Sequence, residues 1–146
     1  MSDQASISRA RIEEIQPLAL DYKREAATTG TAVEPPMPSG ALFWIARTAD
    51  RTDMGYAAGT LRPEGLVLGP VYVLPGYRRS GVGLQLLHEI ERWASTARIP
   101  LVEVSVAMDN DAGIRFLERA GYRSRRVLMA RDADDPNATP AGAVSP

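Results

Sequence analysis

Residues 71–87 read VYVLPGYRRSGVGLQLL, which is a β-branched apolar run, then a polar turn, then the start of an apolar pattern with helical period. This succession predicts a strand, a turn and an amphipathic helix reaching about residue 97. The first amides of a helix have no partner within it, and the helix dipole is positive there. Glycine lets the backbone approach an anion closely, so Arg78-x-x-Gly81-x-Gly83 predicts a cradle for a diphosphate.

Two other glycine motifs are excluded by residue type. The phosphate-binding loop Gly-x4-Gly-Lys-Ser/Thr needs a lysine, and the one lysine of the chain is Lys23. The dinucleotide fingerprint needs a third small residue where this chain has Leu86, and also a different topology. For a glycine turn taken alone, a plain corner that binds nothing remains an alternative.

Hydrophobic periodicity and turn residues predict the flanking elements. Three strands joined by short turns indicate an antiparallel half, and the strand–helix–strand unit over residues 66–107 predicts a parallel pair. We therefore expect an α/β fold with a mixed, mostly antiparallel sheet and helices on both faces. Gly69-Pro70 predicts a bulge or a splay within its strand. The expected strands are 6–9, 41–48, 55–62, 66–74, 99–107 and 122–130. The expected helices are 11–27, 84–97 and 110–120, a turn covers 75–83, and a loop covers 28–40.

Length and composition bound the function. The 146 residues predict one domain over residues 1–130 and a disordered tail over 131–146. The near balance of 17 basic and 18 acidic side chains argues against nucleic acid as the main partner. The absence of cysteine and the single histidine, His88, exclude disulfides, thiolate metal sites and two-histidine sites, so no metal is expected. Without an apolar targeting or spanning run, we expect no membrane association and a cytoplasmic location.

Two motifs carry a family resemblance. Residues 71–87 resemble motif A of the GCN5-related N-acetyltransferases (GNAT), whose signature is Gln/Arg-x-x-Gly-x-Gly/Ala. Residues 110–122, which read NDAGIRFLERAGY, resemble a later motif of the same family, Asn-x-x-Ala-x-x-x-Tyr-x-Lys-x-Gly-Phe. The resemblance covers residues 41–130. It implies a GNAT-like acyl-CoA N-acyltransferase fold with splayed fourth and fifth strands. It also implies transfer of an acetyl group from acetyl-CoA to an amine of a small molecule or peptide.

The resemblance also assigns the cofactor-binding residues. The diphosphate of acetyl-CoA takes backbone amides beside Arg78, and the pantetheine arm runs along the strand that precedes the turn. An N–H near the end of that strand meets the developing oxyanion. Asn110 contacts the pantetheine arm or nearby backbone, serves only as a helix N-cap, or does both. The predicted amides are those of Arg79, Ser80, Gly81, Val82, Gly83 and Leu84, and the predicted strand residues are Val71, Tyr72 and Val73.

The catalytic assignment departs from the family pattern. Leu117 occupies the slot where the family usually has a general-acid tyrosine, and leucine donates no proton. Tyr72, Ser105 or a water molecule could replace that acid. Glu103 is our first choice as general base because it shares a strand face with Ser105, and its alternative is an exposed or ion-paired strand carboxylate. Glu34 and Glu64 are weaker candidates.

Two alternative functions and the number of strands stay open. The missing tyrosine keeps a non-catalytic acyl-CoA-binding regulatory domain of the same fold as an alternative function, and a structural domain that binds nothing is a third. The family usually has two strands where this chain has the segment 122–130. One strand is therefore missing, merged, or supplied by a partner chain in a homodimer.

Overall fold

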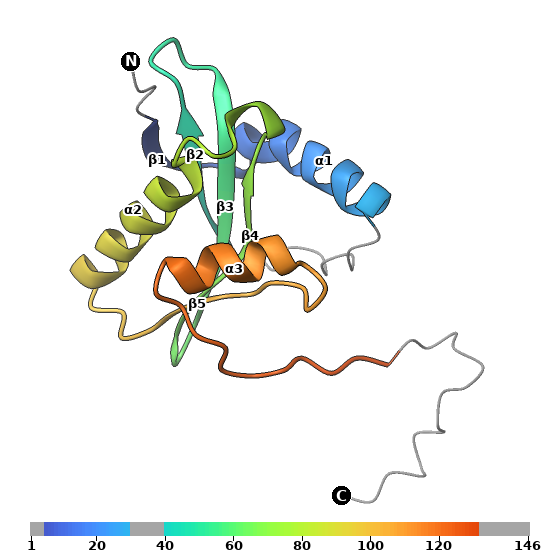
Figure 1. The fold of residues 1–146 in the computed structure, drawn as a ribbon. Coiled ribbons are helices and arrows are strands. Elements are labelled where there is room, and N and C mark those ends of the chain that lie inside the picture. The colour runs from blue at the N-terminus through green and yellow to red at the C-terminus, as the bar shows by residue number, and fades with distance from the viewer. Residues whose placement is uncertain (1–4, 30–39, 132–146) are drawn as a thin grey trace, which may run out of the picture.

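The computed structural model describes residues 5–29 and 40–131. Five strands form one sheet in sequence order (Figure 1). The first four strands pair antiparallel, and β5 pairs parallel to β4. The predicted mixed, mostly antiparallel sheet is confirmed. The strands are β1 (Ser6–Ala10), β2 (Leu42–Arg47), β3 (Asp53–Arg62), β4 (Gly65–Val73) and β5 (Val102–Val104).

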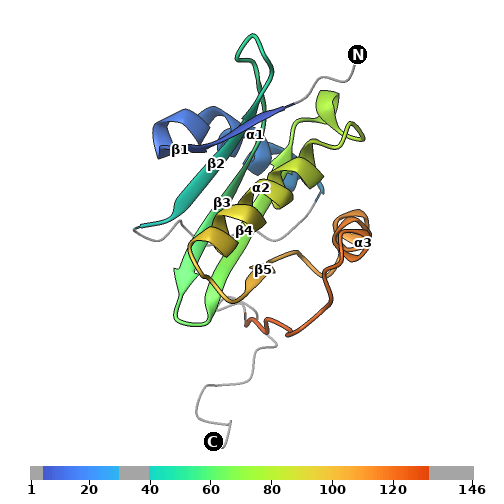
Figure 2. The ribbon, with the colours of Figure 1, turned by 90° about the vertical axis from the view of Figure 1, so that its left-hand side faces the viewer.

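The helices cover both faces of the sheet, as expected. Figure 1 shows α1 (Ile12–Thr29) and α2 (Val82–Thr96) on opposite sides of the central strands. A short 3-10 turn, η1 (Pro75–Tyr77), joins β4 to α2, and α3 (Asp111–Arg119) stands beside β5 (Figure 2). The helix α1 runs through Pro17 without a break. No helix in the described part of the chain combines the length and the hydrophobicity needed to cross a bilayer.

Alternation along β2 divides the core into two clusters. Trp44 and Ala46 face α2, whereas Phe43 and Ile45 face α1, because successive side chains of a strand point to opposite faces. The apolar stripe of α2 completes the first cluster, and that of α1 completes the second. The stripes comprise Val82, Leu86, Leu87 and Ile90 from α2, and Ile15 and Leu18 from α1, all of them fully buried.

A bulge in β4 sets the geometry of the sheet centre. Gly59 pairs with Leu68 and Ala57 pairs with Val71, so β4 has one residue more than β3 between these two pairs. Pairing with β5 extends only from Leu66 to Leu68, and the N–H of Ser105 donates to the Leu68 carbonyl 2.7 Å away. The predicted bulge at Gly69-Pro70 and the splay of the fourth and fifth strands are both confirmed.

The predicted strand over residues 122–130 is wrong. The structure assigns no strand to the described residues after α3, and Val127, Leu128 and Met129 are 64, 90 and 84% exposed. A strand needs backbone partners along its length, but β5 spans only three residues. The segment contacts β5 through side chains instead, because Arg125 and Arg126 pair with Glu103. Residues 30–39 of the predicted loop and residues 132–146 of the predicted tail lie outside the described residues.

Replacing Leu86 by alanine tests the α2 face of the core. Leu86 is 0% exposed, so the cavity left behind should lower the free energy of unfolding by about 2–5 kcal/mol. Urea unfolding followed by circular dichroism measures the loss. Leu20→Ala is the control, because Leu20 is 49% exposed on α1 and should cost less than about 0.5 kcal/mol. Equal losses in the two variants would contradict this core assignment.

Candidate active site

The turn between η1 and α2 presents a run of free backbone amides. Arg79 and Gly81 have left-handed φ angles of 64° and 87°. The N–H of Arg78 donates to the Pro75 carbonyl, and the next amide with a partner, that of Gln85, donates to the Gly81 carbonyl 3.0 Å away. Within the described residues, the six amides from Arg79 to Leu84 therefore make no hydrogen bond. These six are the amides that the sequence predicts as the diphosphate cradle.

The two glycines of the turn serve different purposes. A Cβ on Gly81 would meet no atom within 4 Å, so glycine is needed there for its positive φ and leaves open space. A Cβ on Gly83 would lie 3.2 Å from the ring of Phe116 in α3. Gly83 therefore lets α3 pack closely against the start of α2, whereas Gly81 shapes the cradle itself.

The N–H and C=O of Val73, the last residue of β4, point toward the gap between β4 and β5. The N–H of Leu74 donates to the Met54 carbonyl of β3 at 2.8 Å. Because peptide groups alternate along a strand, the N–H and C=O of Val73 point away from β3. The β4–β5 pairing ends before this residue, at Leu68. Val73 thus offers an N–H toward the gap between the strands, at the end of β4 where we expect the oxyanion to form.

Arg78 lies against the α1 face of the site. Its Nε donates to the Val73 carbonyl at 2.9 Å, and its guanidinium pairs with Glu25 at 2.8 Å. The guanidinium carbon lies 5.7 Å from the centre of the Tyr72 ring. The side chain of Arg78 therefore contacts α1 and β4, and the positive charge next along the turn is that of Arg79.

Sequence reasoning missed Glu25. The signal was available, because Ile15, Leu18 and Tyr22 form the apolar stripe of α1 and Glu25 continues that stripe three residues on. A carboxylate on a buried stripe needs a polar partner. Among the described residues, Arg78 is one such partner of Glu25, and the phenol of Tyr72, which donates to its Oε2 at 2.9 Å, is another.

Tyr72 is the predicted site residue with the most perturbed environment. Burial and the neighbouring carboxylate of Glu25 raise the pKa of the Tyr72 phenol to about 12. Its ring packs edge-on against Tyr22 and Tyr56, with ring centres 5.5 and 6.2 Å away. A phenol with this pKa keeps its proton throughout the neutral range, and in the structure its O–H donates to Glu25.

The structure places the other catalytic candidates elsewhere. Glu103 pairs with Arg126 and, at 3.6 Å, with Arg125, which is the ion-paired alternative stated above. Ser105 is exposed, and Glu64 lies exposed in the turn before β4. Glu34 lies outside the described residues. The structure therefore brings Tyr72 together with Glu25 and Arg78, and it surrounds Glu103 with arginines.

The second motif has a structural role in α3. Asn110 caps the helix, since its Oδ1 accepts the N–H of Gly113 at 2.9 Å. Leu117 is buried in the α2-face core. The nearby Tyr122 does not replace the missing acid, because its phenol donates to Glu91 of α2 and burial raises its pKa well above the usual value. In the described ranges, no three His, Asp or Glu side chains lie close enough to hold a metal ion.

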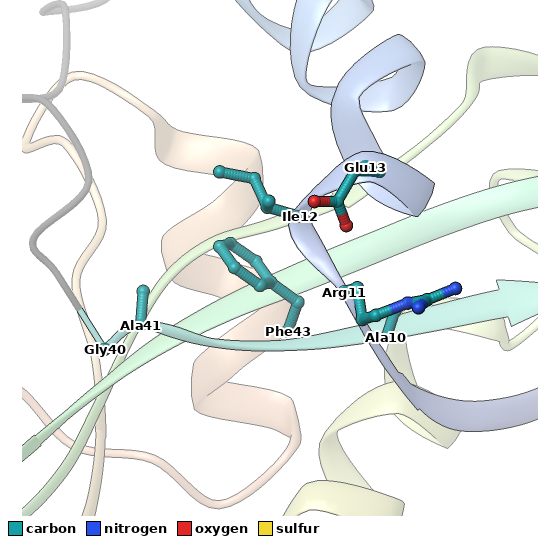
Figure 3. Close-up of a pocket in the computed structure, with 7 residues that line it drawn as sticks. All are labelled: Ala10, Arg11, Ile12, Glu13, Gly40, Ala41 and Phe43. Atoms are coloured by element: carbon teal, nitrogen blue, oxygen red, sulfur yellow. The ribbon is translucent and has the colours of Figure 1, made fainter.

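A hollow of about 450 Å³ opens at the other end of α1. Figure 3 shows the side chains of Ile12 and Phe43 projecting into it, with Glu13 at its border. Glu13 and Glu25 are twelve residues apart on one helix, which corresponds to about 18 Å. This hollow is therefore separate from the cluster around Tyr72. Its lining is Ala10, Arg11, Ile12, Glu13, Gly40, Ala41 and Phe43.

Three solved structures show how closely known proteins share this fold. A protein from Klebsiella pneumoniae, assigned as an acyl-CoA N-acyltransferase, has a TM-score of 0.70 at 20% identity, over 92% of this chain and 93% of its own. An aminoglycoside N-acetyltransferase in complex with CoA has a TM-score of 0.66 at 19% identity, over 87 and 98%. A transcriptional regulator from Bacillus halodurans has a TM-score of 0.67 at 15% identity, over 88 and 99%.

Sequence comparison assigns the family. Among curated proteins, no sequence matches the chain. The family model described as the acetyltransferase (GNAT) family matches residues 12–122, which include α1, the whole sheet beyond β1, the amide cradle and α3. The chain therefore belongs to the acetyltransferase (GNAT) family.

Proposed function

We propose that the protein transfers the acetyl group of acetyl-CoA to an amine of a small molecule or peptide. The observation that carries this proposal is the run of six free amides from Arg79 to Leu84, at the motif by which the sequence resembles its family. A diphosphate that accepts these N–H groups at the positive end of α2 satisfies donors that otherwise have no protein partner. The fold that the chain shares with a CoA-bound aminoglycoside acetyltransferase supports coenzyme A as the ligand.

The splay beside β4 suits the rest of the donor. The pantetheine arm lies along Val71, Tyr72 and Val73 on the side that β5 leaves free, with Asn110 as a further contact. The thioester carbonyl then faces the outward N–H of Val73. That N–H stabilises the oxyanion as the amine attacks, and the bond to sulfur breaks with loss of the coenzyme A thiolate.

Proton transfer is the step for which the chain lacks the usual family residue. A thiol with a pKa of about 8.5 leaves as a thiolate near neutrality, so an acid assists without being indispensable. The phenol of Tyr72 is our candidate for that acid, since it keeps its proton at neutral pH and lies one residue from the Val73 peptide. Glu103 and Ser105 stay candidates of lower rank because neither contacts the Tyr72 cluster in the described residues.

The activity is tested with acetyl-CoA and a panel of primary amines, with free thiol detected by a disulfide reagent. We expect amine-dependent release of coenzyme A. Calorimetry on the same preparation measures coenzyme A binding. Binding without thiol release for any amine would instead favour the non-catalytic regulatory alternative, and no binding at millimolar coenzyme A would refute both.

Replacing Gly81 by glutamate tests the cradle. The substitution puts a carboxylate and a strained φ where the diphosphate binds, so coenzyme A affinity should fall about 100-fold or more. Gly121→Glu is a matched control because Gly121 has a similar φ of 97° and also has open space around its Cβ position. A folded Gly81→Glu variant that binds coenzyme A as the wild type does would contradict the placement of the donor.

The protonation state of Tyr72 is tested by spectrophotometric titration at the tyrosinate band. The difference between wild type and Tyr72→Phe should show no ionisation of Tyr72 near pH 10, the ordinary value, because its pKa is about 12. In the Glu25→Gln background, Tyr72 should ionise at a lower pH than in the wild type, since the carboxylate that disfavours the phenolate is gone. Ionisation of Tyr72 near pH 10 in the folded wild type would exclude it as an acid held protonated by its surroundings.

A further inference from the structure

The positively charged side chain of Arg78 lies beside the last peptide of β4. The guanidinium of Arg78 contacts the carboxylate of Glu25, the ring of Tyr72 and the carbonyl of Val73. A carboxylate, an aromatic face and a carbonyl oxygen are the groups that bind ammonium and guanidinium ions in proteins. The charge of Asp21 also acts on Tyr72, which adds to the negative potential here. The structure therefore contains a built cation site that is filled by a side chain of the same protein.

The position of this cation matters for the reaction. Val73 offers its N–H and its C=O on the same side of β4, and Arg78 holds the C=O at 2.9 Å. The proposed function puts the thioester carbonyl on the N–H of that same residue. A nucleophilic nitrogen has to stand about 3–3.5 Å from the thioester carbon to attack it. The guanidinium of Arg78 thus occupies the neighbourhood that the acceptor nitrogen needs.

The side chain of Arg78 is also able to move away from Glu25 and Tyr72. The Arg78 and Glu25 side chains are 43 and 33% exposed, and an ion pair in contact with solvent contributes little free energy. Arg78 directly precedes the six free amides. A diphosphate bound to those amides presents charged oxygens to which an arginine binds with two N–H groups at once. Donor binding therefore creates a competing and more highly charged partner for the same guanidinium.

We propose that Glu25 and Tyr72 form the subsite for the cationic amine of the acceptor, that Arg78 fills this subsite before the donor binds, and that the donor diphosphate draws Arg78 away. This inference rests on the proposed function and specifies its acceptor as a protonated primary amine. It also specifies the order of binding, because the acceptor enters a subsite that the donor has cleared. Glu25 and Tyr72 then hold the ammonium next to the thioester. The ammonium gives one proton to solvent water, which reaches the partly exposed Glu25 carboxylate, and the neutral amine attacks the thioester carbon.

A double-mutant cycle on coenzyme A affinity tests the exchange without knowledge of the acceptor. Glu25→Gln keeps an acceptor for the Tyr72 phenol and removes the charge that retains Arg78. Coenzyme A should then bind about two- to fivefold more tightly, the range expected from losing an exposed ion pair. Arg78→Gln should weaken binding. In the Arg78→Gln background, Glu25→Gln should have no effect, since no guanidinium remains to be released.

Glu13→Gln is the control for the cycle. It removes the same charge from the exposed first turn of the same helix and should leave coenzyme A affinity unchanged. The exchange is refuted if Glu25→Gln binds coenzyme A no more tightly than Glu13→Gln does. It is also refuted if the gain from Glu25→Gln persists in full in the absence of Arg78.

Benzylammonium is a probe for the subsite itself, because it combines a primary ammonium with a ring that is able to pack on Tyr72. Saturation-transfer NMR should detect it on the coenzyme A complex and not on the free protein. The signal should be lost in Glu25→Gln and kept in Glu13→Gln. Binding that does not depend on coenzyme A, binding that survives in Glu25→Gln, or no binding to the complex would each overturn the assignment.

The two levels of the proposal fail separately. If the wild type binds no coenzyme A at millimolar concentration, the proposed function itself is wrong. If the wild type binds coenzyme A but the cycle shows no coupling between Glu25 and Arg78, the donor site stands and only the acceptor subsite is rejected.

Discussion

The proposed activity depends on one electrostatic arrangement, which is a row of backbone N–H groups before and at the start of α2 that have no acceptor among the described residues. Left-handed turns at Arg79 and Gly81 bring the chain into α2 so that six successive amides stay free. Free donors at the positive end of a helix favour an anion. The surrounding fold holds this row in place, since the apolar stripe of α2 is buried against the sheet.

The bulge in β4 determines which groups of the strand lie near the free amides. One extra residue before Val71 switches the faces of the strand, so Val71 and Val73 pack toward α2 while Tyr72 turns toward α1. The same irregularity coincides with the end of the β4–β5 pairing at Leu68, so within the described residues no strand pairs with Val73 on the side away from β3. The free amides, the outward N–H of Val73 and the cluster of Glu25, Tyr72 and Arg78 therefore follow from one turn and one irregularity of the backbone.

Most of the fold and the position of the free amides could be predicted from local signals. Helical and alternating periods identify the strands and helices, and Gly69-Pro70 and Gly81 mark the bulge and the turn by their own backbone requirements. The strand predicted over 122–130 failed because strand formation depends on a pairing partner, which a local pattern does not reveal. Glu25 was missed for a related reason: its contact with Arg78 joins residues 53 positions apart and exists only once α1 packs on the sheet.

The central claim is tested most directly by backbone NMR, with amide shifts of labelled protein followed as coenzyme A is added. The account predicts that the largest shifts, with loss of rapid solvent exchange, fall on the amides of residues 79–84 and that Val73 follows when acetyl-CoA replaces coenzyme A. Saturable shifts centred on another part of the chain, or none at millimolar ligand, would contradict it.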